Sequence, residues 1–128
     1  MHNLLTCLMQ HSSVWQGALD RLRIDSAARL VAIIDIEAIP LATSPEGLDV
    51  SSLVGRWAAL MQSTSPVSFK AESGPLEEII ISADDGEIIT QRLGDQYWLL
   101  LIIEESAFLG RARHAIQEHM DNLIRRLP

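Results

Sequence analysis

The second half of the chain alternates short apolar runs with turn residues. The runs span residues 76–83, 87–93 and 96–103, and they are rich in β-branched and aromatic side chains. Gly86 and Gly94 stand between them, each beside an aspartate, and glycine takes a positive φ without steric cost. This pattern predicts three antiparallel strands joined by two tight turns.

A helical repeat follows the last predicted strand. Its apolar residues return at three- and four-residue steps and share one helix face: Leu109, Ala112, Ile116, Met120, Leu123 and Leu127. Ser106 precedes them, and a serine hydroxyl at that position can accept a hydrogen bond from the first helical turn. We therefore expect Ser106 to be the N-cap of a final helix.

The first half predicts one or two helices and two strands. Apolar residues over 4–22 share one helix face, although Ser12-Ser13 could instead cap a second helix. Residues 30–36 are apolar on both faces, which is typical of a strand buried on both sides and central in a sheet. The following strand starts with Pro40, which cannot donate a ladder hydrogen bond, so we place it at a sheet edge.

A further amphipathic helix is predicted between these strands and the meander. It begins at Asp49 or Ser51, and Pro66 should end or kink it because proline lacks a backbone donor. Its apolar stripe includes Trp57, and tryptophan is enriched at interface hot spots. The stripe therefore either covers the sheet of its own chain or also pairs with a second copy.

The predicted order is helix, strand, strand, helix, three strands, helix. We expect an α/β (α+β) fold in which three helices flank an open five-stranded antiparallel sheet on both faces. The chain divides into an N-terminal helical segment over residues 1–24 and one structural unit over residues 25–128.

Composition narrows the functional classes. The 128 residues are 48% hydrophobic, enough for one buried core, and the net charge of −7 disfavours a nucleic-acid partner. A lone Cys7 excludes an intramolecular disulfide and suggests a reducing compartment. The N-terminus lacks the basic region of a signal peptide, and the longest apolar run, residues 97–103, is too short for a membrane span. We expect a cytoplasmic protein.

The polar residues do not form a catalytic motif. His114 and His119 are five positions apart, not the four that place two imidazoles on one helix face, and no phosphate-binding loop or nucleophile motif occurs. We expect no catalytic residue, no cofactor and no bound metal. Arg111 and Arg113 could be offered to a nucleotide in trans, but solvated or salt-bridging arginines are the favoured interpretation.

Three segments resemble the Roadblock/dynein light-chain family. "LVAIIDIEAIPLATS" resembles its opening hairpin, "LEEIIISADDGEIITQRLGDQYWLLLII" its central meander, and "EESAFLGRARHAIQEHM" its final helix, so the likeness covers about Leu30 to Met120. Two positions depart from the family pattern. Glu37-Ala38 stands where the family often has a glycine, and Pro66 interrupts a helix that the family usually runs longer.

The resemblance implies a profilin-like fold that dimerises through the second helix and the strand beginning near Leu76. It also implies a regulator or scaffold for small Ras-like GTPases. Bacterial relatives include GTPase-activating proteins for cell-polarity GTPases, and eukaryotic relatives belong to dynein and lysosomal scaffolds. A non-catalytic scaffold subunit and a small-ligand sensor are the alternative functions, although bulky strand residues such as Trp98 argue against an open cavity.

This interpretation predicts the residues of two surfaces, a dimer interface and a contact surface for the GTPase. The apolar stripe and an edge strand that would otherwise be exposed predict a homodimer. Its expected interface residues are Leu53, Val54, Trp57, Leu60, Met61, Leu76, Ile79 and Ile81. The expected contacts to the GTPase are Arg56, Glu46 and Asp49, on the second helix and the loop before it. We expect any stimulation of hydrolysis to come from ordering the GTPase's own catalytic residues.

Overall fold

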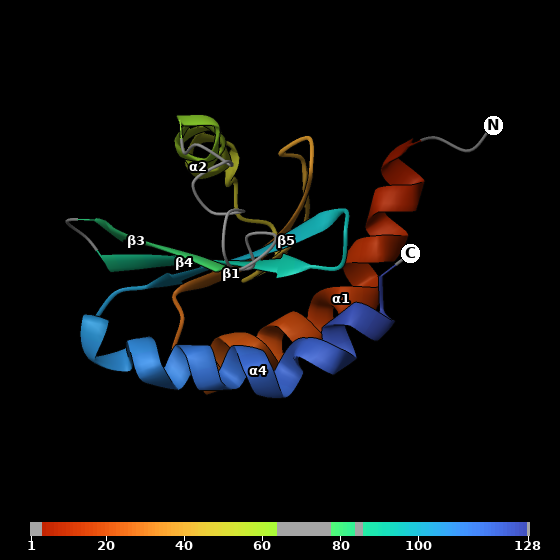
Figure 1. Ribbon diagram of the computed structural model, residues 1–128. Coiled ribbons are helices and arrows are strands. Elements are labelled where there is room, and N and C mark those ends of the chain that lie inside the picture. Colours follow the sequence, from red (N-terminus) through yellow and green to blue (C-terminus); the bar gives the residue numbers. More distant parts are fainter. Residues whose placement is uncertain (1–3, 64–77, 84–85, 128) are drawn as a thin grey trace.

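The order of helices and strands predicted from the sequence is confirmed. The computed structural model describes residues 4–63, 78–83 and 86–127 (Figure 1). Their elements are α1 (Leu4–Ser26), β1 (Leu30–Asp35), β2 (Pro40–Ser44), α2 (Ser51–Ser63), β3 (Glu78–Ala83), β4 (Gly86–Leu93), β5 (Tyr97–Ile103), the 3-10 turn η1 (Ser106–Phe108) and α4 (Leu109–Arg125).

The strands form one antiparallel sheet in the order β2-β1-β5-β4-β3. α2 lies on one face of the sheet, and α1 and α4 lie on the other (Figure 1). β2, which starts with Pro40, is an edge strand as predicted. β1 is internal, but the middle strand is β5, and the second edge of the sheet is β3.

Alternating side chains of β5 supply two separate cores. Leu99, Leu101 and Ile103 pack toward α1 and α4, whereas Leu100 and Ile102 pack beneath α2. Successive residues of a strand point to opposite faces, so a strand covered on both sides must be apolar at every position. The continuous apolar run at residues 97–103 therefore reflects a central place in the sheet.

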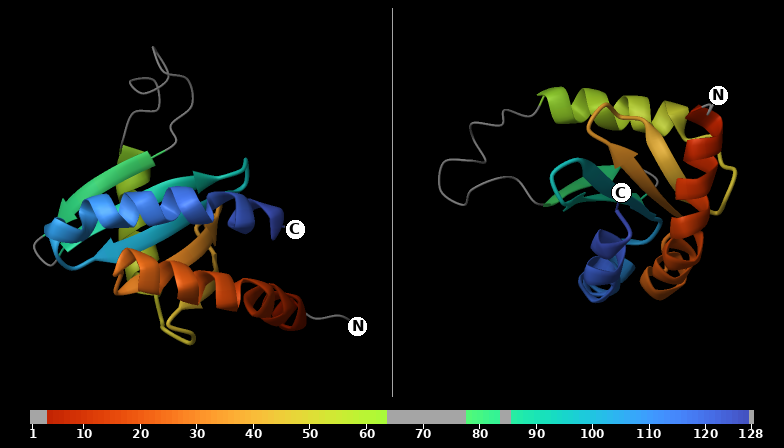
Figure 2. Two further views of the ribbon diagram at one scale, coloured as in Figure 1. Left: turned by 90° about the horizontal axis from the view of Figure 1, so that it is seen from below. Right: turned by 90° about the vertical axis from the view of Figure 1, so that its right-hand side faces the viewer.

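α1 is one helix that passes through Ser12 and Ser13 without a break, and it continues past residue 24 to Ser26. α1 and α4 lie side by side beneath the sheet (Figure 2). Trp15, Leu19 and Leu22 of α1 are each at most 1% exposed and belong to the same core as β5 and α4. The later turns of α1 are thus part of the packed domain.

The start of α4 differs from the prediction. Ser106 begins η1, and neither η1 nor α4 has a side-chain cap hydrogen bond. The reason is that η1 turns the chain out of β5, so Ser106 lies a turn ahead of the helix that begins at Leu109. The predicted apolar face is confirmed, with Ala112 and Ile116 buried against the sheet.

Two turns depend on unusual backbone conformations. Ala38 has φ +65° in the β1–β2 turn, the left-handed region that glycine favours. The Asp35 carboxylate holds this turn, because its Oδ1 accepts hydrogen bonds from the backbone N–H groups of Glu37 (2.8 Å) and Ile39 (3.0 Å). Gly86 has φ +142°, and a Cβ there would lie 2.2 Å from the carbonyl oxygen of Ile103, so only glycine fits.

Candidate functional site

The layer formed by α2 and the sheet is the first part of the candidate site. α2 buries Val54 and Trp57 against the sheet, at 3% and 5% exposure. The Trp57 indole Nε1–H donates a hydrogen bond of 2.9 Å to Thr90 Oγ1 on β4. The Trp57 ring also meets Trp98 edge-on, with ring centroids 6.1 Å apart. Trp57 therefore anchors α2 to the sheet of its own chain.

The predicted dimer residues fall into three groups. Val54 and Trp57 are core residues of their own chain, and their contact with a second copy stays a prediction. Leu53 on α2 and Ile79 and Ile81 on β3 are half-buried. The side chains of Leu60 and Met61, and the whole of Leu76, lie outside the described residues.

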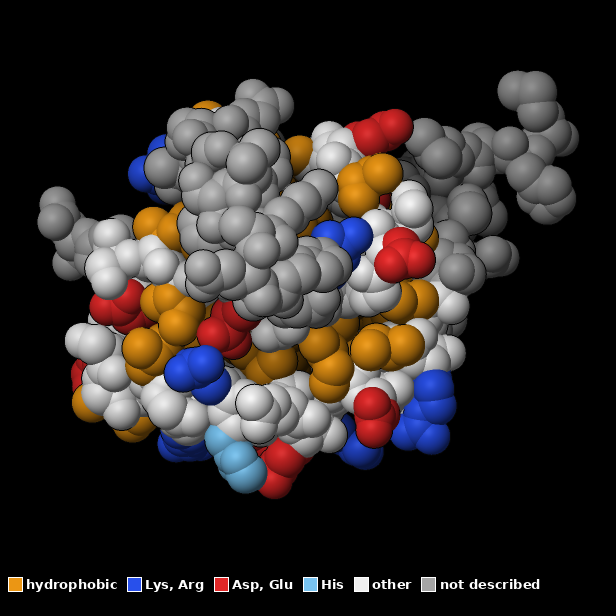
Figure 3. Space-filling model, in the orientation of Figure 1, with side chains coloured by type: hydrophobic (Ala, Val, Ile, Leu, Met, Phe, Trp, Pro, Cys, Tyr) orange, Lys and Arg blue, Asp and Glu red, His pale blue; other side chains and the backbone are white. Residues whose placement is uncertain are grey.

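The β3 edge presents apolar side chains on the face that α2 covers. Ile79 pairs with Thr90 and Ile81 pairs with Ile88 across the β3–β4 ladder. Thr90 bonds to Trp57 and Ile88 packs with the core under α2, so Ile79 and Ile81 share that face. On the side of the molecule shown in Figure 3, hydrophobic side chains gather between α2 and α4.

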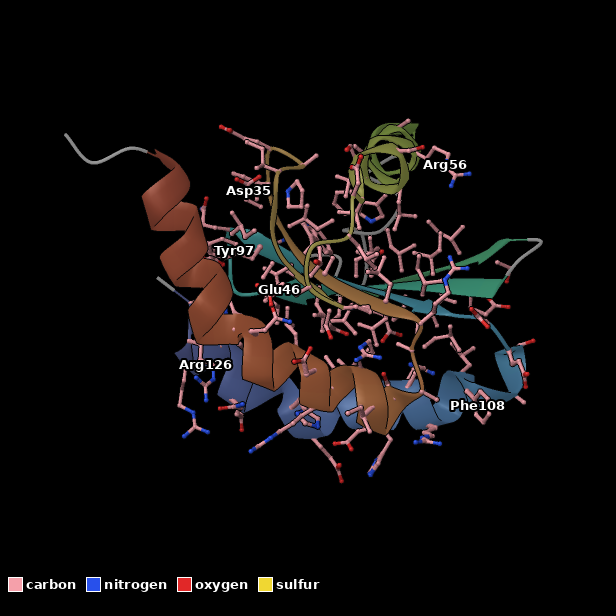
Figure 4. The ribbon with its side chains drawn as sticks, turned by 180° about the vertical axis from the view of Figure 1, so that it is seen from behind. Asp35, Glu46, Arg56, Tyr97, Phe108 and Arg126 are labelled. Carbon is pink, nitrogen blue, oxygen red and sulfur yellow. The ribbon has the colours of Figure 1, made fainter. Side chains whose placement is uncertain are left out.

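The predicted GTPase contacts border two neighbouring pockets rather than one cluster. Arg56 and Asp49 line a pocket of about 440 Å³ beside the start of α2. Glu46 and Asp49 line a second pocket of about 230 Å³ between β2 and the loop that leads to α2. Glu46 and Arg56 do not point toward each other (Figure 4). Asp49 is a residue that the two pockets share.

Two hydrogen bonds from Ser51 hold the Asp49 carboxylate just before the beginning of α2. Its Oδ1 accepts hydrogen bonds from the Ser51 hydroxyl and from the Ser51 backbone N–H, the latter at 3.0 Å. The Ser51 hydroxyl, and then the Ser51 N–H, lower the pKa of the Asp49 carboxyl below its ordinary value. A carboxylate at a helix N-terminus also complements the helix dipole.

The arginines considered as fingers both have partners in this chain. Arg111 donates to the terminal carbonyls of α1, from Nε to Asp25 O at 2.7 Å and from Nη2 to Ile24 O at 3.1 Å. Arg113 forms an ion pair with Glu78 on β3 at 3.0 Å. These contacts support the interpretation of both arginines as bonded surface groups. Sequence reasoning missed the α1 partners of Arg111, because they lie more than eighty positions away and have no local signal.

The histidines on α4 also bond to carboxylates. His114 pairs with Glu118 one turn later at 2.9 Å, and the His119 ring lies 2.7 Å from Asp25 Oδ2 at the end of α1. Within residues 4–63, 78–83 and 86–127, no three histidine, cysteine or acidic side chains gather as metal ligands would. In the same ranges, none of the helices combines the length and hydropathy that crossing a membrane requires.

Comparison with known proteins places this geometry in a known fold. No protein-family model and no curated protein sequence matches the chain. Solved structures do match it. Myxococcus xanthus MglB is 17% identical with a TM-score of 0.71, and 98% of this chain and 91% of that chain are covered. The gliding protein MglB of Thermus thermophilus is 16% identical with a TM-score of 0.75, over 98% of this chain and 93% of that one.

A Roadblock/LC7 domain from Streptomyces avermitillis is 15% identical with a TM-score of 0.62, over 94% of this chain and 99% of that chain. Two profilins of Acanthamoeba castellanii also match, at 19% and 21% identity with TM-scores of 0.56 and 0.58, over 88% of this chain and 98% of each of those chains. At these identities the comparisons establish the fold. The chain has the profilin-like Roadblock fold, and the resemblance to the Roadblock/dynein light-chain family that its sequence indicates is confirmed at that level.

Proposed function

We propose that the protein is a homodimeric regulator or docking module for a small Ras-like GTPase. The observation that carries the proposal is the β3 edge, where Ile79 and Ile81 lie half-buried on the face covered by α2. An unpaired edge with apolar neighbours is an aggregation hazard unless a second strand covers it. Pairing of two β3 edges would join the two sheets, and α2 of each copy would lie over the same face.

The Roadblock fold supports the GTPase as partner. The sequence resemblance implies regulators or scaffolds of small GTPases, and the structures with this fold include a protein named as a gliding protein. The acidic residues Glu46 and Asp49 and the cationic Arg56 flank the start of α2, where both signs of charge are available to a polar partner.

The proposed mechanism needs no catalytic group from this chain. Arg111 and Arg113 bond to α1 and β3, so withdrawing either to serve as a finger would break contacts within the domain. Phosphoryl transfer depends on positioning and charge stabilisation, and a partner accelerates it by ordering the GTPase's own residues. We therefore assign the chain an indirect role in hydrolysis.

Single-turnover hydrolysis tests this proposal with a Ras-like GTPase encoded near the protein's own gene. The wild type should raise the rate, and Arg111→Ala and Arg113→Ala should stimulate to nearly the same extent. A loss of about 10³-fold or more in either variant, the size expected of an arginine finger, would contradict the indirect mechanism. Binding without stimulation would instead favour the non-catalytic scaffold.

A further inference from the structure

The pocket beside the start of α2 has the composition of a peptide-docking site. It opens between α2, the start of β1 and the loop after β2, and its volume is about 440 Å³. That volume lies within the range of about 300–1,000 Å³ typical of binding pockets. The cavity is therefore large enough to receive a bulky side chain from outside the molecule.

The interior of the pocket is apolar. Leu30, Val50 and Ile102 are buried residues that line it, and Leu53 is half-buried. Leu48, on the loop before α2, also lines the pocket and is 47% exposed. An aliphatic side chain this exposed beside an apolar cavity favours an apolar ligand group, because covering both removes apolar surface from water.

The rim of the pocket carries two guanidinium groups. Arg56 is exposed, and no described residue forms a hydrogen bond or an ion pair with it. Arg29 bonds loosely to Glu104 at 3.7 Å, with both side chains about half exposed. Asp49 also lines the rim, but its Oδ1 is engaged by Ser51. The pocket lining thus carries two guanidinium groups and one carboxylate, so its charge is net cationic, although the whole chain is acidic.

We propose that this pocket takes an acidic–apolar segment of a protein partner, with a large apolar side chain in the cavity and a neighbouring carboxylate on Arg56. Guanidinium and carboxylate form paired charge-assisted hydrogen bonds, which fix orientation as well as adding affinity. Hydrophobic anchors in a pocket with polar groups at the rim are the usual anatomy of a docking site.

This inference deepens the proposed function and rests on it only for the identity of the partner. The pocket adjoins Arg56 and Asp49, two of the residues expected to contact the GTPase. The chemistry of the segment follows from the lining alone. Synthetic peptides can probe the pocket without any GTPase. The docking site and the proposed function can therefore each be refuted independently of the other.

NMR titration of the full chain tests the inference. The probes are the peptide Ac-Ser-Asp-Phe-Glu-Ser-NH₂, its uncharged counterpart Ac-Ser-Asn-Phe-Gln-Ser-NH₂, and hexanoate as a free small anion. The acidic peptide should shift the methyl signals of Val50 and Leu53 and the Nε–H signal of Arg56, with roughly millimolar affinity. The uncharged peptide should bind about tenfold more weakly, because it forms no charge-assisted bond.

Matched surface variants separate the two parts of the site. Arg56→Gln should abolish the preference for the acidic peptide, and Arg21→Gln, an exposed arginine on α1, should leave it unchanged. Leu48→Ser should weaken both peptides about equally, whereas Ile24→Ser, at a residue 64% exposed on α1, should not.

Three results would overturn the proposal: no shifts around the pocket with either peptide, equal affinity for the two peptides, or hexanoate binding more tightly than the acidic peptide. Peptide binding whose preference for the acidic sequence is lost in Arg56→Gln, together with no GTPase binding, would leave the docking site standing and remove only the proposed function.

Discussion

The indole N–H of Trp57 donates a 2.9 Å hydrogen bond to the hydroxyl of Thr90 in the buried layer between α2 and the sheet. Trp57 is 5% exposed and Thr90 is fully buried, so water cannot take the place of either hydrogen-bond partner. The bond joins α2 to β4, the neighbour of the β3 edge. It therefore sets the position of α2 over the face proposed to dimerise.

Thr90→Val should destabilise the protein by about 1–3 kcal/mol, because the buried indole N–H loses its acceptor while the volume is kept. Thr90→Ser, which retains the hydroxyl, should be clearly less damaging. Urea unfolding at a fixed protein concentration measures the free energy of unfolding of each variant. Equal free energies of unfolding for Thr90→Val and the wild type would show that the bond does not stabilise the packing of α2 on the sheet.

Charges on the half-buried residues of the α2 face should break the proposed dimer. Ile79→Asp or Ile81→Asp places a charge at the proposed seam, on a β3 residue that is only half-buried in the free chain, so a folded monomer should result. Trp57→Glu is unsuitable for this purpose, because it buries a charge in the core of its own chain.

Sedimentation equilibrium reports the mass of each of these variants, and circular dichroism checks the fold. Ile24→Asp, at an exposed position on α1, is the control and should remain dimeric. A wild type that sediments as a monomer at micromolar concentration would refute the dimer.

Arg111→Ala should lower the free energy of unfolding by about 1 kcal/mol, because two carbonyls at the end of α1 lose their donor. Arg113→Ala should have a smaller effect, since the Arg113 side chain is 52% exposed and water screens its pair with Glu78. Thermal or urea unfolding ranks the two variants. The reverse order would show that the contact with α1 contributes less than the ion pair with β3.

Ser51→Ala should raise the pKa of the Asp49 carboxyl toward its ordinary value of 3.8, because the Ser51 hydroxyl is the main cause of the lowered pKa. A carboxyl with a depressed folded-state pKa adds stability above its unfolded pKa, and that stability is lost as pH falls through the folded value. Asp49→Asn should therefore flatten the acid side of the stability–pH curve. NMR titration of the Asp49 side-chain carboxyl carbon, read against pH, checks the shift directly.

The hairpins could be predicted from the sequence because the signals for them are local. Gly86 and Gly94 both have positive φ where the turns were predicted, and Pro40 begins an edge strand. Residues 30–36 were predicted to be buried throughout, but Ile36 is 59% exposed, because β1 ends at Asp35 and the turn begins there. Apolar character alone did not reveal where this strand ends.

The contacts that define the candidate site were beyond sequence reasoning, because they join residues far apart in the chain. The Trp57–Thr90 bond spans 33 positions, and the bonds from Arg111 to α1 span 86 and 87. The pocket at Arg56 depends on how α2 lies over β1 and β5, which periodicity does not determine. Sequence analysis placed Arg56 on the second helix as an expected partner contact, but it did not identify the residues around Arg56.

The central claim is tested most directly by calorimetric titration of the wild type with a Ras-like GTPase encoded near the protein's own gene. The GTPase is loaded in turn with GDP and with a non-hydrolysable GTP analogue. We predict saturable binding to the dimer with a clear preference for one nucleotide state, and weaker binding by Arg56→Gln than by the control Arg21→Gln. Absence of binding in both nucleotide states would contradict the assignment of this chain to GTPase regulation or docking.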